Sequence, residues 1–340
     1  MDMNFLKELC LAIGISGNET EVKELIKKEV APYADEITET PLGDLIVFKK
    51  GEKAAPKKIM IDAHMDEVGL IINHISEDGY LRFATVGGID SNVLLGKTVY
   101  VNGKTRGVIG GKPVHLMSPS EKEKAVPTHE LTVDIGASTR EEAEAVCSVG
   151  DLINFEPFFE LSRGTVKAKA LDDRMGCAIL VELIKGGMEY DTYFSFSTRE
   201  EVGSIGAKTA AFTVAPELTI AVEGTVAGDV MGTSSPKACT KMGKGPAVSI
   251  SDRGTVYDKT FFKKAFELAE ELDIPCQART NNAGSNDAGM IHRTRRGARA
   301  AAVSVPCRYI HSPVSMASVS DAENAVKLIR ALAKAMVESK

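Results

Sequence analysis

The stretch Lys58-Ile59-Met60-Ile61-Asp62-Ala63-His64-Met65-Asp66-Glu67-Val68-Gly69 decides how the rest of the chain is read. Its apolar run predicts a strand over 58–63, apolar on both faces and therefore inside a sheet that is covered on both sides. The run ends abruptly in a histidine and acids. In an open α/β sheet the binding crevice lies beyond the carboxyl ends of the strands, so we expect His64 and Asp66 to point into one site.

Three later segments have the same pattern, because each places acids or a histidine at the end of a strand-like run. They are Ala170-Leu171-Asp172-Asp173-Arg174, Ser197-Thr198-Arg199-Glu200-Glu201-Val202-Gly203 and Tyr309-Ile310-His311-Ser312-Pro313. An isolated acidic pair is more often a solvated surface pair or a helix cap. Four separate strand ends that deliver His, Asp, Glu and His favour a common site.

The pattern of elements on both sides of these motifs is typical of an α/β fold. Helical spacing over 3–13 and 20–31 is followed by strands, and from about residue 164 onward helices alternate with strands up to a final helix over 320–338. Alternation of this kind predicts a mixed sheet with helices on both faces. We expect one catalytic domain built from residues 1–66 and 164–340.

Residues 67–163 follow a different pattern. Short strands are predicted at 70–75, 80–85, 97–101, 105–109, 131–135 and 152–155, separated by Gly, Asp-Gly and Asn-Gly turns. One helix is predicted near 139–146. The segment therefore reads as a small β-rich, barrel-like domain inserted into the α/β domain.

Composition limits the partners. The 340-residue chain has a formal net charge of −6, which argues against nucleic acid or an anionic membrane as the main partner. The dense basic run Arg293 to Arg299 is most simply a solvated loop or a subunit contact. Six cysteines without Cys-x-x-Cys spacing, and no apolar run of about 20 residues, predict a cytoplasmic protein with reduced thiols and no membrane segment.

The histidines and acids can furnish a site for two divalent cations, which need separate ligands and a carboxylate that bridges them at a spacing of about 3.5–4 Å. His64 and His311 would each hold one ion, Asp172 would bridge, and Glu201 and Glu223 would complete the two sides. Imidazole mixed with carboxylate suits zinc or cobalt, with manganese also possible.

Two further acids receive supporting roles. Glu200 is the neighbour of Glu201, and adjacent residues cannot both face the same ion, which leaves Glu200 as a general base toward a water activated by two metals. Asp66 stands two residues after His64 and is expected to hydrogen-bond its imidazole and set the tautomer.

At these residues the chain resembles metallopeptidase family 42, the tetrahedral (TET), glutamyl and deblocking aminopeptidases, some of which carry the label endoglucanase. The resemblance covers nearly the whole chain and rests on five segments: 63–69, 169–176, 198–203, 227–229 and 309–313. It implies a two-metal aminopeptidase acting on short peptides, with His64, Asp172, Glu201, Glu223 and His311 as ligands, Glu200 as base and Asp66 in support. The chain departs from the family at Glu223, where Asp is common.

The resemblance also implies a homo-oligomer, in which the inserted domain joins dimers that assemble into a dodecamer, and a cis peptide bond between Asp172 and Asp173. A substrate contact is suggested by Arg253, which could pair with an acidic first residue of the peptide; a surface arginine in a turn is the simpler interpretation.

Three alternatives stay open. A deacylase or carboxypeptidase-like amide hydrolase on the same fold would use the same metals. A glycoside hydrolase would need two carboxylates about 5–10 Å apart and no metal. A non-enzymatic peptide-binding scaffold would not need the acids and histidines.

Overall fold

A computed structural model describes residues 1–233, 238–280 and 284–339. Its large body is a mixed sheet with the strand order β1-β2-β12-β3-β13-β16-β17-β11-β10, and β14 and β15 extend it beside β16. The strands are β1 (Glu36–Glu39), β2 (Leu45–Lys49), β3 (Ile59–His64), β10 (Phe159–Ser162), β11 (Thr165–Ala168), β12 (Thr192–Ser197), β13 (Leu218–Val226), β14 (Ala247–Ser249), β15 (Gln277–Arg279), β16 (Arg299–Arg308) and β17 (Ser315–Ser318).

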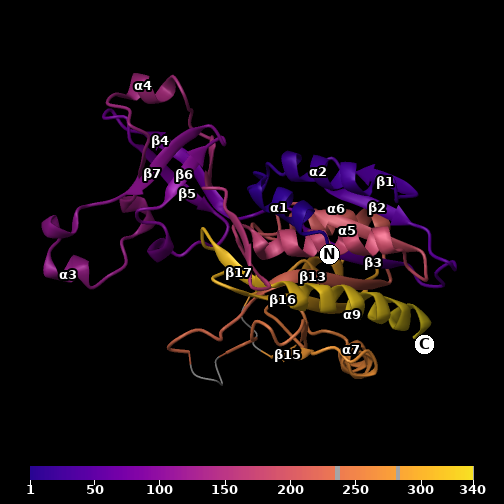
Figure 1. The fold of residues 1–340 in the computed structure, drawn as a ribbon. Coiled ribbons are helices and arrows are strands. Elements are labelled where there is room, and N and C mark those ends of the chain that lie inside the picture. Colours follow the sequence, from indigo (N-terminus) through magenta and orange to yellow (C-terminus); the bar gives the residue numbers. More distant parts are fainter. Residues whose placement is uncertain (234–237, 281–283, 340) are drawn as a thin grey trace.

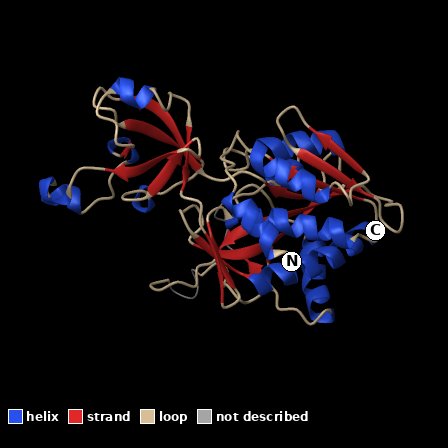
Figure 2. Cartoon of the chain, turned by 45° about the horizontal axis from the view of Figure 1, so that its top comes forward, coloured by secondary structure: helices blue, strands red, loops and turns tan. Residues whose placement is uncertain are grey.

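Helices cover both faces of this sheet (Figures 1 and 2). One face carries α1 (Met3–Leu11), α2 (Thr20–Val30), α5 (Leu171–Gly186), α7 (Lys259–Glu271) and α9 (Val319–Glu338), and the other carries α6 (Ile205–Val214) and α8 (Ala288–Ile291). Helix α5 is buried along almost its whole length, because it lies between the sheet and the other helices. Helix α9 instead buries one stripe, which includes Ala325, Leu328, Leu332 and Met336.

A second, closed sheet stands apart from this body (Figure 1). Its strands follow the order β4-β5-β8-β7-β6-β9, with bounds β4 (Gly69–Ile75), β5 (Leu81–Val86), β6 (Thr98–Val101), β7 (Thr105–Gly110), β8 (Thr132–Asp134) and β9 (Leu152–Phe155). Apolar side chains from alternate positions, such as Leu70 and Ile72, fill its interior. The short helices α3 (Pro119–Lys122) and α4 (Arg140–Glu144) lie in its connections.

The expected fold class is confirmed: a mixed α/β sheet with helices on both faces, and a small barrel between its parts. The division into domains stays our prediction. The barrel strands lie between Gly69 and Phe155, whereas β10 and β11, which follow, pair with each other at the edge of the large sheet.

Several edge elements were missed from the sequence. These elements are the short strands β1, β10, β11 and β17. Their residues are partly exposed or lie at the margin of the sheet. Their hydrophobic pattern is therefore too weak to predict a strand. All six cysteines are free thiols, as expected. Within the described ranges, every helix is too short or too polar to cross a lipid bilayer.

Candidate active site

The carboxyl ends of parallel strands gather the predicted residues. Strands β12, β3, β13 and β16 run parallel to one another, so their carboxyl ends meet at one edge of the sheet. His64 is the last residue of β3, and Glu223 lies on β13. Glu200 and Glu201 follow the end of β12, and His311 follows the end of β16. Five residues from four segments that are far apart in sequence therefore share one edge.

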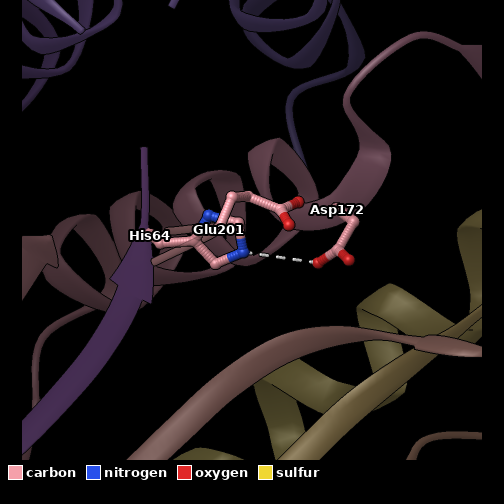
Figure 3. A group of neighbouring side chains, drawn as sticks. All are labelled: His64, Asp172 and Glu201. Carbon is pink, nitrogen blue, oxygen red and sulfur yellow. Dashed lines mark ion pairs between the residues drawn. The ribbon is translucent and has the colours of Figure 1, made fainter. Parts of the chain in front are cut away.

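Asp172 lies between the two histidines. Its Oδ1 is 3.5 Å from Nε2 of His64, and its Oδ2 is 3.6 Å from Nε2 of His311. Figure 3 shows the carboxylates of Asp172 and Glu201 close to the His64 ring. The peptide bond between Asp172 and Asp173 is cis, as the family resemblance implies. One carboxylate thus presents a different oxygen to each imidazole.

The two glutamates lie on the outer sides of this row. Oε1 of Glu201 is 3.1 Å from Nε2 of His311, and Oε2 of Glu223 is 3.6 Å from Nε2 of His64. Nε2 of each histidine therefore faces Asp172, which the two share, and one glutamate: Glu223 for His64 and Glu201 for His311. Glu223 therefore lies on the His64 side of the row.

The donor atoms are close enough together to hold metal ions. In one group, His64, Asp172 and Glu201 offer ligand atoms within 4.8 Å of one another, and in a second group His64, Asp173 and Glu223 do so. Oδ1 of Asp172, which lies 3.5 Å from Nε2 of His64, and Oδ2 of Asp173 are buried and accept no hydrogen bond from any described residue. Buried carboxylate oxygens rarely stay unpaired, so a cation fits the position, and mixed imidazole and carboxylate donors suit a transition metal.

Asp173 is a residue that sequence reasoning missed as a potential donor. Its sequence position suggested a helix cap, and its Oδ1 does accept the N–H of Gly176 at 3.0 Å. One of its carboxylate oxygens lies within 4.8 Å of the donor atoms of His64 and Glu223. An acid at the start of a helix can cap the helix and also offer an oxygen to a metal ion. The spacing of residues in the sequence does not distinguish these two roles.

Asp66 connects three parts of the site. Its Oδ1 accepts the backbone N–H of Glu200 at 2.9 Å, and its Oδ2 accepts that of Glu201 at 3.1 Å and the hydroxyl of Ser16 at 2.6 Å. Nδ1 of His64 lies 3.3 Å from Oδ1 of the same carboxylate. The side chain therefore fixes the turn that carries both glutamates as well as the imidazole.

The ionisation of the cluster follows from burial and close charge. Burial lowers the pKa of His311, but the nearby carboxylates of Asp172 and Glu201 outweigh that effect and raise it to about 11. His64 shows the same direction: burial lowers its pKa, but Asp172 and Asp66 raise it well above the ordinary value. In return the two histidines hold the pKa of Asp172 well below its usual range, against the effect of its burial.

Glu200 has a different environment from Glu201. Burial raises its pKa well above the ordinary value, and the charge of His64 opposes that rise. Its hydrogen-bond contact is weak, the hydroxyl of Ser204 at 3.5 Å, whereas Glu201 faces His311 at 3.1 Å. The Glu200 carboxylate is therefore at the site without being tied into the row of donors.

A buried ion cluster fixes two of the motifs to each other. Oε1 of Glu67 accepts hydrogen bonds from Lys169 at 2.6 Å and from Arg174 at 3.2 Å. Arg174 also donates to the carbonyls of Met65 and Leu9, at 2.8 and 2.6 Å. These charges are almost fully buried, so removing any one of them would leave a buried charge without a compensating partner. The cluster holds the segment after β3 against the start of α5, where Asp172 lies.

Arg253 is not brought to this cluster by any contact between described residues. It is exposed, in a turn after β14, and its N–H donates to the carbonyl of Gly284 at 2.8 Å. Strand β14 runs antiparallel to β16, so its carboxyl end points away from the edge that carries His64. The turn itself is well held, because Asp252 accepts the N–H groups of Gly254 and Thr255.

Comparisons with known proteins identify the family of the chain. The sequence model of the M42 glutamyl aminopeptidase family matches residues 43–328. The lysyl aminopeptidase of Pyrococcus furiosus is 33% identical over 342 residues, which cover 98% of this chain and 96% of the relative.

Solved structures give the same result. The TET aminopeptidase of the marine sediment archaeon Thaumarchaeota archaeon SCGC AB-539-E09 is 38% identical, with a TM-score of 0.93 over 97% of this chain and 95% of that one. The TET1 peptidase of Pyrococcus horikoshii, described as able to assemble into a tetrahedron or a large octahedral shell, is 35% identical with a TM-score of 0.85, covering 97% and 98%. The chain is thus an aminopeptidase of the M42 metallopeptidase family.

Proposed function

We propose that the protein removes N-terminal residues from short peptides with the help of two divalent metal ions, zinc or cobalt in the first place and manganese as a further possibility. The observation that carries this proposal is the position of Asp172, whose two oxygens face two different histidines at 3.5 and 3.6 Å. A carboxylate in that position is suited to bridge two ions. Glu201 and Glu223 would complete the ligand sets of His311 and His64.

The chain's own residues would divide the remaining work. When bound, divalent ions polarise a peptide carbonyl and lower the pKa of water. Glu200 would take a proton from the attacking water and pass it to the leaving amine, since its carboxylate is free of the donor row. Asp66 would hold the imidazole of His64 and the Glu200–Glu201 turn in place.

The main rival is a deacylase or carboxypeptidase-like hydrolase that uses the same donors. A panel of free and N-acetylated aminoacyl substrates separates the two, tested with metal-free protein and after zinc, cobalt or manganese is added. We expect metal-restored hydrolysis of free amino termini alone. Activity only on acetylated substrates would assign a deacylase, and chelator-resistant cleavage of a β-glucan would assign a glycoside hydrolase.

We further propose that the inserted domain, residues 67–163, joins subunits and that the protein assembles as a dodecamer built from dimers. The support is the resemblance to TET structures and the separate position of the barrel (Figure 1). Sedimentation of the intact protein tests this, because a monomer at micromolar concentration would contradict it.

For substrate choice, the sequence offers Arg253 as a partner for an acidic first residue. Its exposed guanidinium is the only support. If Arg253→Ala leaves the ratio of Glu-peptide to Leu-peptide turnover unchanged, this assignment is wrong.

A further inference from the structure

A surface cavity of about 770 Å³ lies at the sheet edge opposite to the candidate active site. Its walls come from residues that precede or begin strands: Lys57 before β3, Glu217 and Leu218 at the start of β13, and Arg299 at the start of β16. His64 lies at the other end of β3. The cavity is therefore separate from the metal-ligand cluster and takes no part in the proposed peptide hydrolysis.

The lining of this cavity is strongly basic, although the whole chain has a net charge of −6. Its charged members are four cations and one acid: Lys57, Arg295, Arg296, Arg299 and Glu217. The acid is already engaged, because Oε1 of Glu217 accepts the backbone N–H of Lys58 at 3.3 Å. The positive charge of the cavity thus comes from Lys57 and from three arginines between positions 295 and 299.

Most of this charge has no acidic partner. Arg299 pairs with Asp258 at 2.8 Å. Arg295 and Arg296, by contrast, form no ion pair with any residue in the described ranges, and Lys57, which also has no acidic partner there, donates its Nζ to the backbone carbonyl of Ser339. Unpaired cations around one concave space are a favourable environment for an anion.

Arg295 is held in position before any ligand arrives. The guanidinium of Arg295 lies over the ring of Phe212, 3.9 Å from its centroid, which leaves the edge of the guanidinium free to donate hydrogen bonds. Arg295 has a φ of 55°, in the left-handed region that an arginine rarely adopts. A hydrogen bond from Gly297 N–H to the carbonyl of Thr294, at 3.0 Å, closes this turn.

We propose that this cavity is a binding site for a small anion that carries two or more phosphate groups. The volume is within the usual range of small-molecule pockets. Arginine forks match phosphate oxygens in pairs, and several cations are needed to balance more than one phosphate. A single cavity of this size suits a compact anion better than an extended nucleic acid strand, which needs a continuous groove.

Pyrophosphate is the probe, and binding is measured by calorimetry on the assembled, metal-loaded protein. The variants are R295A/R296A, which removes the two unpaired pocket arginines, and R293A as the matched control. Arg293 belongs to the same basic run, but it does not line the cavity and its guanidinium contacts Met290. All proteins are brought to the same metal content. The amount of pyrophosphate that binds to the metal ions, rather than to the cavity, is then the same in each protein.

We expect wild type and R293A to bind with equal affinity, and R295A/R296A to bind roughly tenfold more weakly or worse, with peptidase activity and melting temperature unchanged. Four results would overturn the proposal. In the first, wild type binds pyrophosphate no more tightly than R295A/R296A does, and in the second, R293A loses as much pyrophosphate affinity as the double variant. In the third, a single-stranded oligoribonucleotide binds more tightly than pyrophosphate and depends on the same arginines. In the fourth, R295A/R296A still binds pyrophosphate but changes the mass of the assembly.

Discussion

The backbone carbonyl of Gly88 lies 2.8 Å from Nδ1 of His311. Gly88 belongs to the loop after β5 of the barrel, whereas His311 follows β16 of the large sheet. A carbonyl oxygen can only accept, so Nδ1 must carry the proton, and the lone pair of neutral His311 is left on Nε2, which faces Asp172 and Glu201. The barrel therefore helps to set the state of a residue that we propose as a metal ligand.

This contact predicts different effects at two neighbouring glycines. Gly87 has a φ of 80°, and a Cβ added there would lie 2.8 Å from Cγ1 of Val68 and 3.2 Å from Cβ of Glu201. A Cβ on Gly88 would meet Nδ1 of His311 at an ordinary 3.6 Å. Gly87→Ala should therefore weaken metal binding by roughly tenfold, because the strain is about 1–3 kcal/mol and falls on Glu201.

Gly88→Ala is the control and should bind metal nearly as the wild type does. Metal titrations of both variants check this. Equal affinities in the two variants would show that the loop does not position Glu201 and His311.

Asp66 should matter for metal affinity without binding a metal itself. Asp66→Ala removes the acceptor for the N–H groups of Glu200 and Glu201 and the carboxylate beside His64. Loss of such a supporting group typically lowers metal affinity by about 10–100-fold. The measurement is a competition titration against a chelator, and Ser16→Ala, which removes one of the same hydrogen bonds, should cost much less. An unchanged affinity in Asp66→Ala would contradict this role.

Much of this site could be predicted from sequence because its residues stand at the ends of strongly apolar strands. His64 after 59–63 and Glu201 after 192–197 are read directly from that pattern. The Gly88 contact could not be found in this way, since a backbone carbonyl leaves no signal in residue type. The direction of the strand before Arg253 could not be predicted either, because sequence does not reveal that β14 runs antiparallel to β16; a substrate contact by Arg253 stays a prediction.

The two adjacent glutamates should respond differently to the same substitution. Glu200→Gln keeps the shape of the side chain and removes a proton acceptor, so turnover should fall by about 10²–10⁴-fold while metal content stays full. Glu201→Gln should instead lose metal, since its carboxylate faces His311. Activity and metal content are measured on the same preparations. Retained activity in metal-loaded Glu200→Gln would remove Glu200 from the mechanism.

Metal binding should release protons and should strengthen as the pH rises. The pKa of His311 is raised to about 11 and that of His64 lies well above its ordinary value. In the metal-free protein both rings are therefore imidazolium ions at neutral pH, with a proton on each nitrogen. A metal must displace that proton, and each proton released makes affinity rise by about tenfold per pH unit. Calorimetry between pH 6 and 8, in buffers with different ionisation enthalpies, counts these protons. Affinity that is independent of pH would contradict the protonated state.

The number of metal ions per subunit tests the central claim most directly. Wild type, His64→Ala, His311→Ala and Asp172→Ala are loaded with zinc or cobalt, freed of excess metal and analysed by mass spectrometry. A two-metal site bridged by Asp172 predicts about two ions in the wild type, less in each histidine variant, and loss at both positions in Asp172→Ala. A single ion in the wild type, or full occupancy in Asp172→Ala, would contradict the bridging arrangement.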